Sequence, residues 1–160
     1  MATLPQIIEE DIREMDAALD DLVVQSEATA AVIIDKGGFR IAERGDSSQI
    51  DTTTLAALAS GLYMAAQYLA NLVDELNFSS VYQQGERSSL LVNNIDEHCL
   101  LVVIFRAQIS VGAVKYYAQT AISRIASQLR TAEERAPGEG YDLSVMNIAE
   151  TTDLFRKRTE

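Results

Sequence analysis

The stretch from Asp51 to Asn77 is predicted to form one long helix that is apolar on nearly every side. One stripe, spaced alternately by three and four residues, consists of Leu55, Leu58, Leu62, Ala65, Leu69, Leu72 and Leu76. The next stripe is also apolar and consists of Ala56, Ala59, Tyr63, Ala66, Ala70 and Val73. A third and only weakly polar stripe consists of Ala57, Gly61, Met64 and Tyr68.

The leucine stripe has the spacing of an ordinary core face. A helix without a solvated face must be buried on more than one side, but 160 residues are too few to surround it. We therefore expect a second copy or another protein to cover the rest of this helix.

A first helix is predicted from about Pro5 to Val24, with a single apolar face. That face consists of Ile8, Ile12, Met15, Leu19 and Leu22. The other positions carry seven acids, which we expect to point outward: Glu9, Glu10, Asp11, Glu14, Asp16, Asp20 and Asp21.

Five strands and one more helix are predicted in the remaining sequence. The run from Thr29 to Asp35 and the segment from Phe39 to Ala42 flank Lys36-Gly37-Gly38 and form a hairpin. Further strands are predicted at 80–84, 88–94 and 98–105, with connections short enough to require antiparallel neighbours. The last of these is the most apolar and should lie inside the sheet. A helix is predicted over 112–130.

The resulting order is α-β-β-α-β-β-β-α, which indicates an α+β fold: a single antiparallel five-stranded sheet with a long central helix and flanking helices. We assign residues 1–130 to one domain and residues 131–160 to an acidic linker and C-terminal tail. The tail is expected either to be disordered or to contain a docking helix near Met146, Ala149 and Asp153, followed by Leu154 and Phe155.

Composition and charge narrow the range of partners. The net charge is −11, and residues 1–30 hold eight acids and one base, which argues against nucleic acid as a partner and allows a basic protein. No run approaches the length of a membrane span, so membrane insertion is not expected. The single cysteine, Cys99, is typical of a reducing compartment, and we expect a cytoplasmic protein.

Residues with catalytic potential are few. His98 and Cys99 are neighbours in a predicted strand and point to opposite sides, so they cannot act as base and nucleophile. A histidine at the start of a strand is expected at the surface. No metal-ligand spacing and no phosphate-binding glycine motif is found, so the sequence predicts no catalytic residue, metal or cofactor.

Four segments together resemble the Roadblock family, specifically its bacterial MglB type. They are AAVIIDKGGFRIA at 30–42, TLAALASGLYMAAQYLANLV at 54–73, YQQGERSSLLV at 82–92 and LLVVIF at 100–105. The resemblance covers about residues 5–130. It implies a homodimer whose long helices lie side by side and whose sheets join through the strand at 80–84. The dimer interface would then contain Ala56, Ala59, Tyr63, Ala66, Ala70 and Val81.

The resemblance also implies binding to a Ras-like small GTPase, preferentially in its GTP-bound form. Proteins of this type stimulate GTP hydrolysis through the switch regions without supplying a catalytic arginine, and so have no active site of their own. Cell polarity and motility are the processes implied. We expect the GTPase to contact Ala57, Gly61, Met64 and Tyr68 on the outward face of the helix pair.

The chain departs from the family at Tyr63, Met64 and Tyr68, where small residues are usual, so the interface is either bulkier or altered. The alternative function is a non-activating Roadblock scaffold for a GTPase or motor complex. A small-molecule sensor is a third alternative, which would need a pocket between helix and sheet, and the leucine stripe looks too well filled to leave one.

Overall fold

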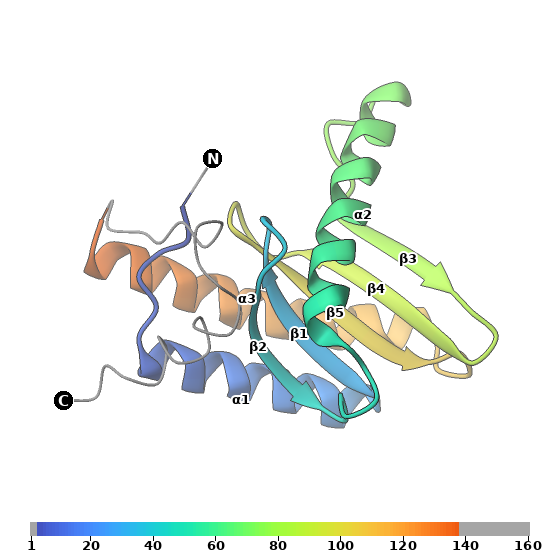
Figure 1. Cartoon of the computed structure of the whole chain (residues 1–160), viewed down its shortest axis with the longest axis horizontal. Helices are drawn as coiled ribbons and strands as arrows, with labels where there is room; N and C mark the ends of the chain where they lie inside the picture. The colour runs from blue at the N-terminus through green and yellow to red at the C-terminus, as the bar shows by residue number, and fades with distance from the viewer. Residues whose placement is uncertain (1–2, 138–160) are drawn as a thin grey trace.

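The computed structural model describes residues 3–137, which form three helices on the two faces of one antiparallel sheet (Figure 1). The elements are α1 (Glu9–Ser26), β1 (Ala30–Asp35), β2 (Arg40–Gly45), α2 (Thr52–Leu72), β3 (Ser80–Gln84), β4 (Ser88–Asn94), β5 (Cys99–Arg106) and α3 (Val111–Arg135). The predicted α+β order is confirmed. The strands lie in the order β2-β1-β5-β4-β3, so β5 is central, as its apolar sequence predicts, and β3 is an edge strand.

The central strands are buried on both faces because their alternating side chains feed two separate cores. In β1 and β5, Ile33, Leu101 and Val103 pack in the core beneath α1 and α3. Val32, Leu100 and Val102 point the other way and pack beneath α2. In Figure 1, α1 and α3 lie on one side of the sheet and α2 on the other.

The helices α1 and α3 close the first core with long side chains. Met15, Leu19 and Leu22 of α1 are fully buried, as the predicted stripe requires, and so are Ile125 and Leu129 of α3. The helix α3 continues to Arg135, five residues beyond its predicted end at 130. Its last turns belong to the packed layer because Ala132 is fully buried.

The prediction that all acids of the first helix point outward is wrong for Asp11, which is fully buried. Its carboxylate accepts hydrogen bonds from Arg135 Nη1 and Nη2 (both 2.9 Å), Gln128 Nε2 (2.6 Å) and the Ile8 backbone N–H (2.8 Å). Burial raises the pKa of Asp11, but these hydrogen bonds outweigh it and the net pKa lies below the ordinary value of 3.8. The buried charge is therefore tolerated because Arg135 pairs with it and both carboxylate oxygens accept hydrogen bonds.

The long helix begins where the sequence predicts and ends earlier. Asp51 caps α2, because its side chain accepts the Thr54 backbone N–H at 3.1 Å. The helix stops at Leu72 rather than Asn77, and Asp74 takes a left-handed backbone conformation with φ of 60°. The hairpin between β1 and β2 touches α2: a Cβ added to Gly38, whose φ is 95°, would lie 3.2 Å from the Ala57 Cα.

The predicted tail, including Met146, Ala149, Asp153, Leu154 and Phe155, lies outside the described residues. The division into residues 1–130 and 131–160 stays a prediction.

Candidate protein-interaction site

The helix α2 packs on the sheet through alanines and one tyrosine. Ala56, Ala59 and Tyr63 pack against Val32, Ile34, Val92, Leu100 and Val102. Hydrogen bonds also attach α2 to neighbouring segments. The Ser60 hydroxyl donates to the Lys36 carbonyl at 2.6 Å. Gln67 donates to and accepts from the Phe78 backbone at 3.1 and 3.2 Å. The position of α2 on the sheet is therefore fixed within one chain.

The residues of the predicted dimer interface lie mostly against the chain's own sheet. Five of its six residues, Ala56, Ala59, Tyr63, Ala66 and Ala70, are at most 8% exposed in the single chain. The chain's own atoms already bury them, and their place in a dimer interface stays a prediction. The sequence did not indicate this packing because all stripes of this helix are apolar, and periodicity alone does not show which one faces the sheet.

The leucine stripe, expected as a core face, is largely exposed. Leu58 is 68% exposed, Leu72 80% and Leu76, beyond the helix end, 92%. The exposed large apolar residues of this region are Leu58, Met64, Tyr68, Leu69, Leu72, Val73 and Leu76. The helix itself contains no charged residue. In Figure 1 the C-terminal part of α2 extends past the sheet. An uncharged apolar surface of this kind marks a protein-interaction site.

The predicted GTPase-contact residues share an exposed face. Ala57, Gly61, Met64 and Tyr68 are all exposed, on the side of α2 that is turned away from the sheet. A residue advances about 100° around a helix, so this outward stripe and the leucine stripe are roughly 100° apart. Two partners can therefore approach α2 from different sides.

The predicted edge residue Val81 is half-buried and pairs with Val92 of β4. It packs at the margin of the core beneath α2. Because β3 ends the sheet, its outer edge is not paired within the part of the chain that the structure describes. Such an edge can accept a strand from a second copy.

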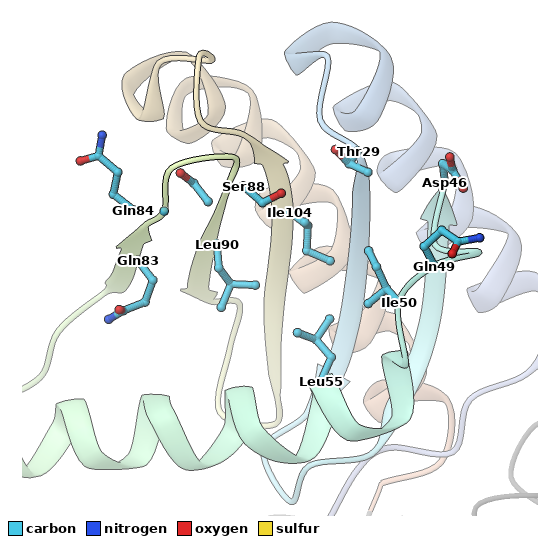
Figure 2. A pocket seen from close by; sticks show the side chains of 12 residues that line it. Thr29, Asp46, Gln49, Ile50, Leu55, Gln83, Gln84, Ser88, Leu90 and Ile104 are labelled. Carbon is cyan, nitrogen blue, oxygen red and sulfur yellow. The ribbon is translucent and has the colours of Figure 1, made fainter.

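An open cavity of about 630 Å³ lies at the N-terminal end of α2 (Figure 2). Ile50, Leu55, Leu90 and Ile104 converge on it, with Gln83 and Gln84 of β3 at one side and Thr29 and Asp46 at another. The expectation that the leucine stripe fills the space between helix and sheet is therefore wrong at Leu55. The leucine side of α2 therefore lies on the same side of the helix as β3 and β4.

A smaller and more polar cavity, of about 370 Å³, lies farther along α2. Its lining residues are Lys36, Ser60, Tyr63, Met64, Gln67, Asn77, Asn94 and Leu100. The Lys36 ammonium lies 5.7 Å from the centre of the Tyr63 ring. Burial lowers the pKa of Lys36, an effect that Asp96 and Glu97 partly offset, and burial raises the pKa of Tyr63. Sequence reasoning missed this cavity because its residues come from five separate segments.

His98 and Cys99 form no reactive pair. His98 is 9% exposed, so the expectation of a surface histidine is wrong; its Nε2 lies 3.4 Å from Glu97 Oε1. Burial raises the pKa of the Cys99 thiol well above its ordinary value, which disfavours the reactive thiolate. Within residues 3–137, no cluster of histidine, cysteine and acidic side chains is arranged to hold a metal ion. The same residues include no helix long and apolar enough to span a bilayer.

These features define a domain of the α+β class with one exposed helix that contains no charged residue. A family model described as the Roadblock/LC7 domain matches residues 15–105. The chain therefore belongs to the Roadblock/LC7 family, and the predicted resemblance is confirmed.

Solved structures support the MglB type within this family. Myxococcus xanthus MglB is 29% identical, with a TM-score of 0.73, and the match covers 79% of this chain and 96% of that one. The gliding protein MglB from Thermus thermophilus is 28% identical, with a TM-score of 0.75 and coverage of 82% and 99%. A further MglB structure, described as having a tetrameric arrangement, is 27% identical, with a TM-score of 0.76 and the same coverage. No curated protein matches the sequence.

Proposed function

We propose that this protein is a homodimer that binds a Ras-like small GTPase, preferentially in its GTP-bound form, and stimulates GTP hydrolysis through the switch regions without supplying catalytic residues. The observation that carries the proposal is the exposed, uncharged surface of α2 in a chain of MglB type. A regulator of this kind has no active site of its own, acts in the cytoplasm and takes part in cell polarity or motility.

The proposed dimer uses the leucine side of α2 and the edge of β3. Leu58, Leu69 and Leu72 are exposed, and the cavity beside Leu55 is also lined by Gln83 and Gln84 of β3. A second copy placed there would cover the leucines and extend the sheet at Val81. MglB has been solved in a tetrameric arrangement, so self-association occurs among its relatives. This assignment replaces the buried alanine stripe.

The outward stripe of Ala57, Gly61, Met64 and Tyr68 remains available to the GTPase in such a dimer. Met64 is 51% exposed and Tyr68 71%. Methionine and tyrosine are favoured in protein interfaces because they provide a large contact area. Their size agrees with a bulkier, partner-specific contact.

The first experiment compares binding and turnover. Ras-like GTPases of the source organism would be loaded with a non-hydrolysable GTP analogue or with GDP, and single-turnover hydrolysis would be measured with and without this protein. An activator must prefer the GTP form, because equal affinity for both forms shifts no equilibrium. Equal binding with an unchanged rate would instead support the scaffold.

Matched variants locate the two surfaces. Met64→Glu should weaken GTPase binding by about thirtyfold, the effect of losing an interface anchor, and leave the dimer intact. Leu69→Glu should dissociate the dimer in analytical ultracentrifugation. Val24→Glu is the control, because Val24 is 77% exposed on α1, across the sheet from α2. Unchanged binding by Met64→Glu would remove the outward stripe from the proposed contact.

A further inference from the structure

The polar cavity beside α2 contains a cation, Lys36, that makes no ion pair within residues 3–137, although the charges of Asp96 and Glu97 lie near enough to raise its pKa. Lys36 follows β1, and its backbone is fixed on both sides: its N–H donates to the His98 carbonyl at 2.8 Å, and its carbonyl accepts from Ser60 at 2.6 Å. Among the ion pairs between described side chains, none includes Lys36. The ammonium instead rests over the Tyr63 ring. Its charge is therefore held in place by the fold without being neutralised by a contacting acid.

Terminal amides line the same cavity as Lys36 and can contribute to a site for an anion. The Asn94 Oδ1 atom is buried and has no hydrogen-bond partner among the described residues. A half turn of the Asn94 amide would present its NH₂ group instead, and Asn77, which is exposed, contributes a second amide to the same cavity. One ammonium and two amides are the donor types that bind a carboxylate.

We propose that this cavity receives an aspartate or glutamate side chain of the GTPase docked on α2, an inference that rests on the proposed function. The carboxylate would contact Lys36 Nζ and the amides of Asn77 and Asn94. A cavity of about 370 Å³ has ample room for such a side chain.

The location of the cavity favours the GTPase over a second copy as the source of the carboxylate. Met64, which belongs to the outward stripe, lines the cavity. Ser60 and Gln67 lie on the flank of α2 opposite the leucines, where the proposed dimer contact is not made. A carboxylate arriving with the GTPase thus reaches Lys36 without crossing the dimer interface.

An ion pair at Lys36 would fix the position of the GTPase along α2. The helix α2 contains no charged residue, so an apolar partner surface could slide along it without a fixed register. An ion pair at one place on such a surface selects one register and rejects partners that lack the acid. Lys36 is the cation that lines a cavity next to the outward stripe.

The test replaces Lys36 with glutamine in the full chain and uses Lys115→Gln as the matched control. Lys115 is exposed on α3, across the sheet. Affinity for the GTP-loaded GTPase should fall about tenfold or more with K36Q, remain unchanged with K115Q, and be partly restored by Lys36→Arg. Added salt should weaken wild-type binding more than binding of K36Q.

The outcomes separate this inference from the proposed function. If wild type binds the GTPase and K36Q binds equally well, the carboxylate site is wrong while the proposed function stands. If K36Q dissociates the dimer in analytical ultracentrifugation, the carboxylate comes from the second copy, and the assignment to the GTPase is overturned.

If no GTPase binds wild type, the proposed function fails and a small probe tests the cavity directly. N-acetylglutamate amide at millimolar concentration should shift the NMR signals of the Lys36 and Tyr63 side chains. N-acetylglutamine amide, the neutral probe of equal size, should not, and K36Q should abolish the response. Equal shifts with both probes would rule out carboxylate recognition at this cavity.

Discussion

The two faces of the sheet are covered in different ways. Beneath α1 and α3, long apolar side chains such as Leu19 and Ile125 fill the core, and both helices keep a charged outer surface. Ion pairs join the layer: Asp21 to Arg124 at 2.6 Å and Asp11 to Arg135 at 2.9 Å. Beneath α2, alanines and Tyr63 make the contact, while Leu58, Leu69, Leu72 and Tyr68 remain exposed.

Within residues 3–137, one face of the sheet is covered by helices with a charged outer surface, and the other by a helix that leaves large apolar side chains exposed. An amphipathic helix such as α1 buries its apolar face against the core and exposes its polar face to solvent. The helix α2 turns Ala56, Ala59 and Tyr63 toward the sheet, whereas its exposed large side chains are Leu58, Met64, Tyr68, Leu69 and Leu72. We expect these exposed side chains to make contacts outside the chain. Removing that exposed apolar area from water would stabilise a complex at about 25 cal/mol per Å² before the costs of association.

The largest predicted effect comes from a charge placed beneath α2. Ala59→Arg should prevent folding, because Ala59 is 2% exposed against Val32 and Val102, and a buried unpaired charge costs more than about 4 kcal/mol. Leu72→Arg, at a position 80% exposed, should change the free energy of unfolding by at most about 0.5 kcal/mol and still weaken the dimer. Chemical denaturation followed by circular dichroism measures both.

The reverse result would overturn the assignment of the two stripes. A folded, monomeric Ala59→Arg variant would mean that the alanine stripe faces a second copy after all.

The next largest effect concerns the face of the sheet that α1 and α3 cover. Asp11→Ala should destabilise the fold by about 2–4 kcal/mol, because Arg135 and the Ile8 N–H lose their shared acceptor in a buried setting. Asp20→Ala is the control: its ion pair with Arg44 is 48% exposed on the acid and contributes at most about 1 kcal/mol. Equal losses for both variants would contradict the special role of the buried carboxylate.

A smaller, pH-dependent effect follows from the lowered pKa of Asp11. The folded state holds this carboxylate ionised below the ordinary pKa of 3.8, so its contribution to stability is complete above that pH and disappears as pH falls through the lower folded value. The stability difference between wild type and Asp11→Asn should therefore be constant near neutrality and shrink below about pH 4. A difference that grows on acidification would show that the pKa is raised.

The order of the elements could be predicted because each has a local signal: the period of α1, the glycines of the hairpin and the apolar run of β5. The stripe of α2 that faces the sheet could not, because all its stripes are apolar and the choice depends on close packing. Asp11 was misassigned because its partner Arg135 is 124 residues away. The Lys36 cavity had no local signal, since its donors meet only after folding.

The smallest predicted effect concerns Gly61, on the outward stripe of α2. Glycine inside a helix costs about 1 kcal/mol relative to alanine. A Cβ added at Gly61 meets no atom of residues 3–137 within 4 Å, so nothing in that part of the chain explains the glycine. Gly61→Ala should therefore raise the free energy of unfolding of the monomeric Leu69→Glu background by up to about 1 kcal/mol.

If the GTPase backbone approaches α2 closely at Gly61, the methyl group of Gly61→Ala should weaken GTPase binding in the dimer. Gly112→Ala, near the start of α3, is the control that changes a helical glycine on the opposite face. Binding that is unchanged in Gly61→Ala would place the closest backbone approach elsewhere on α2.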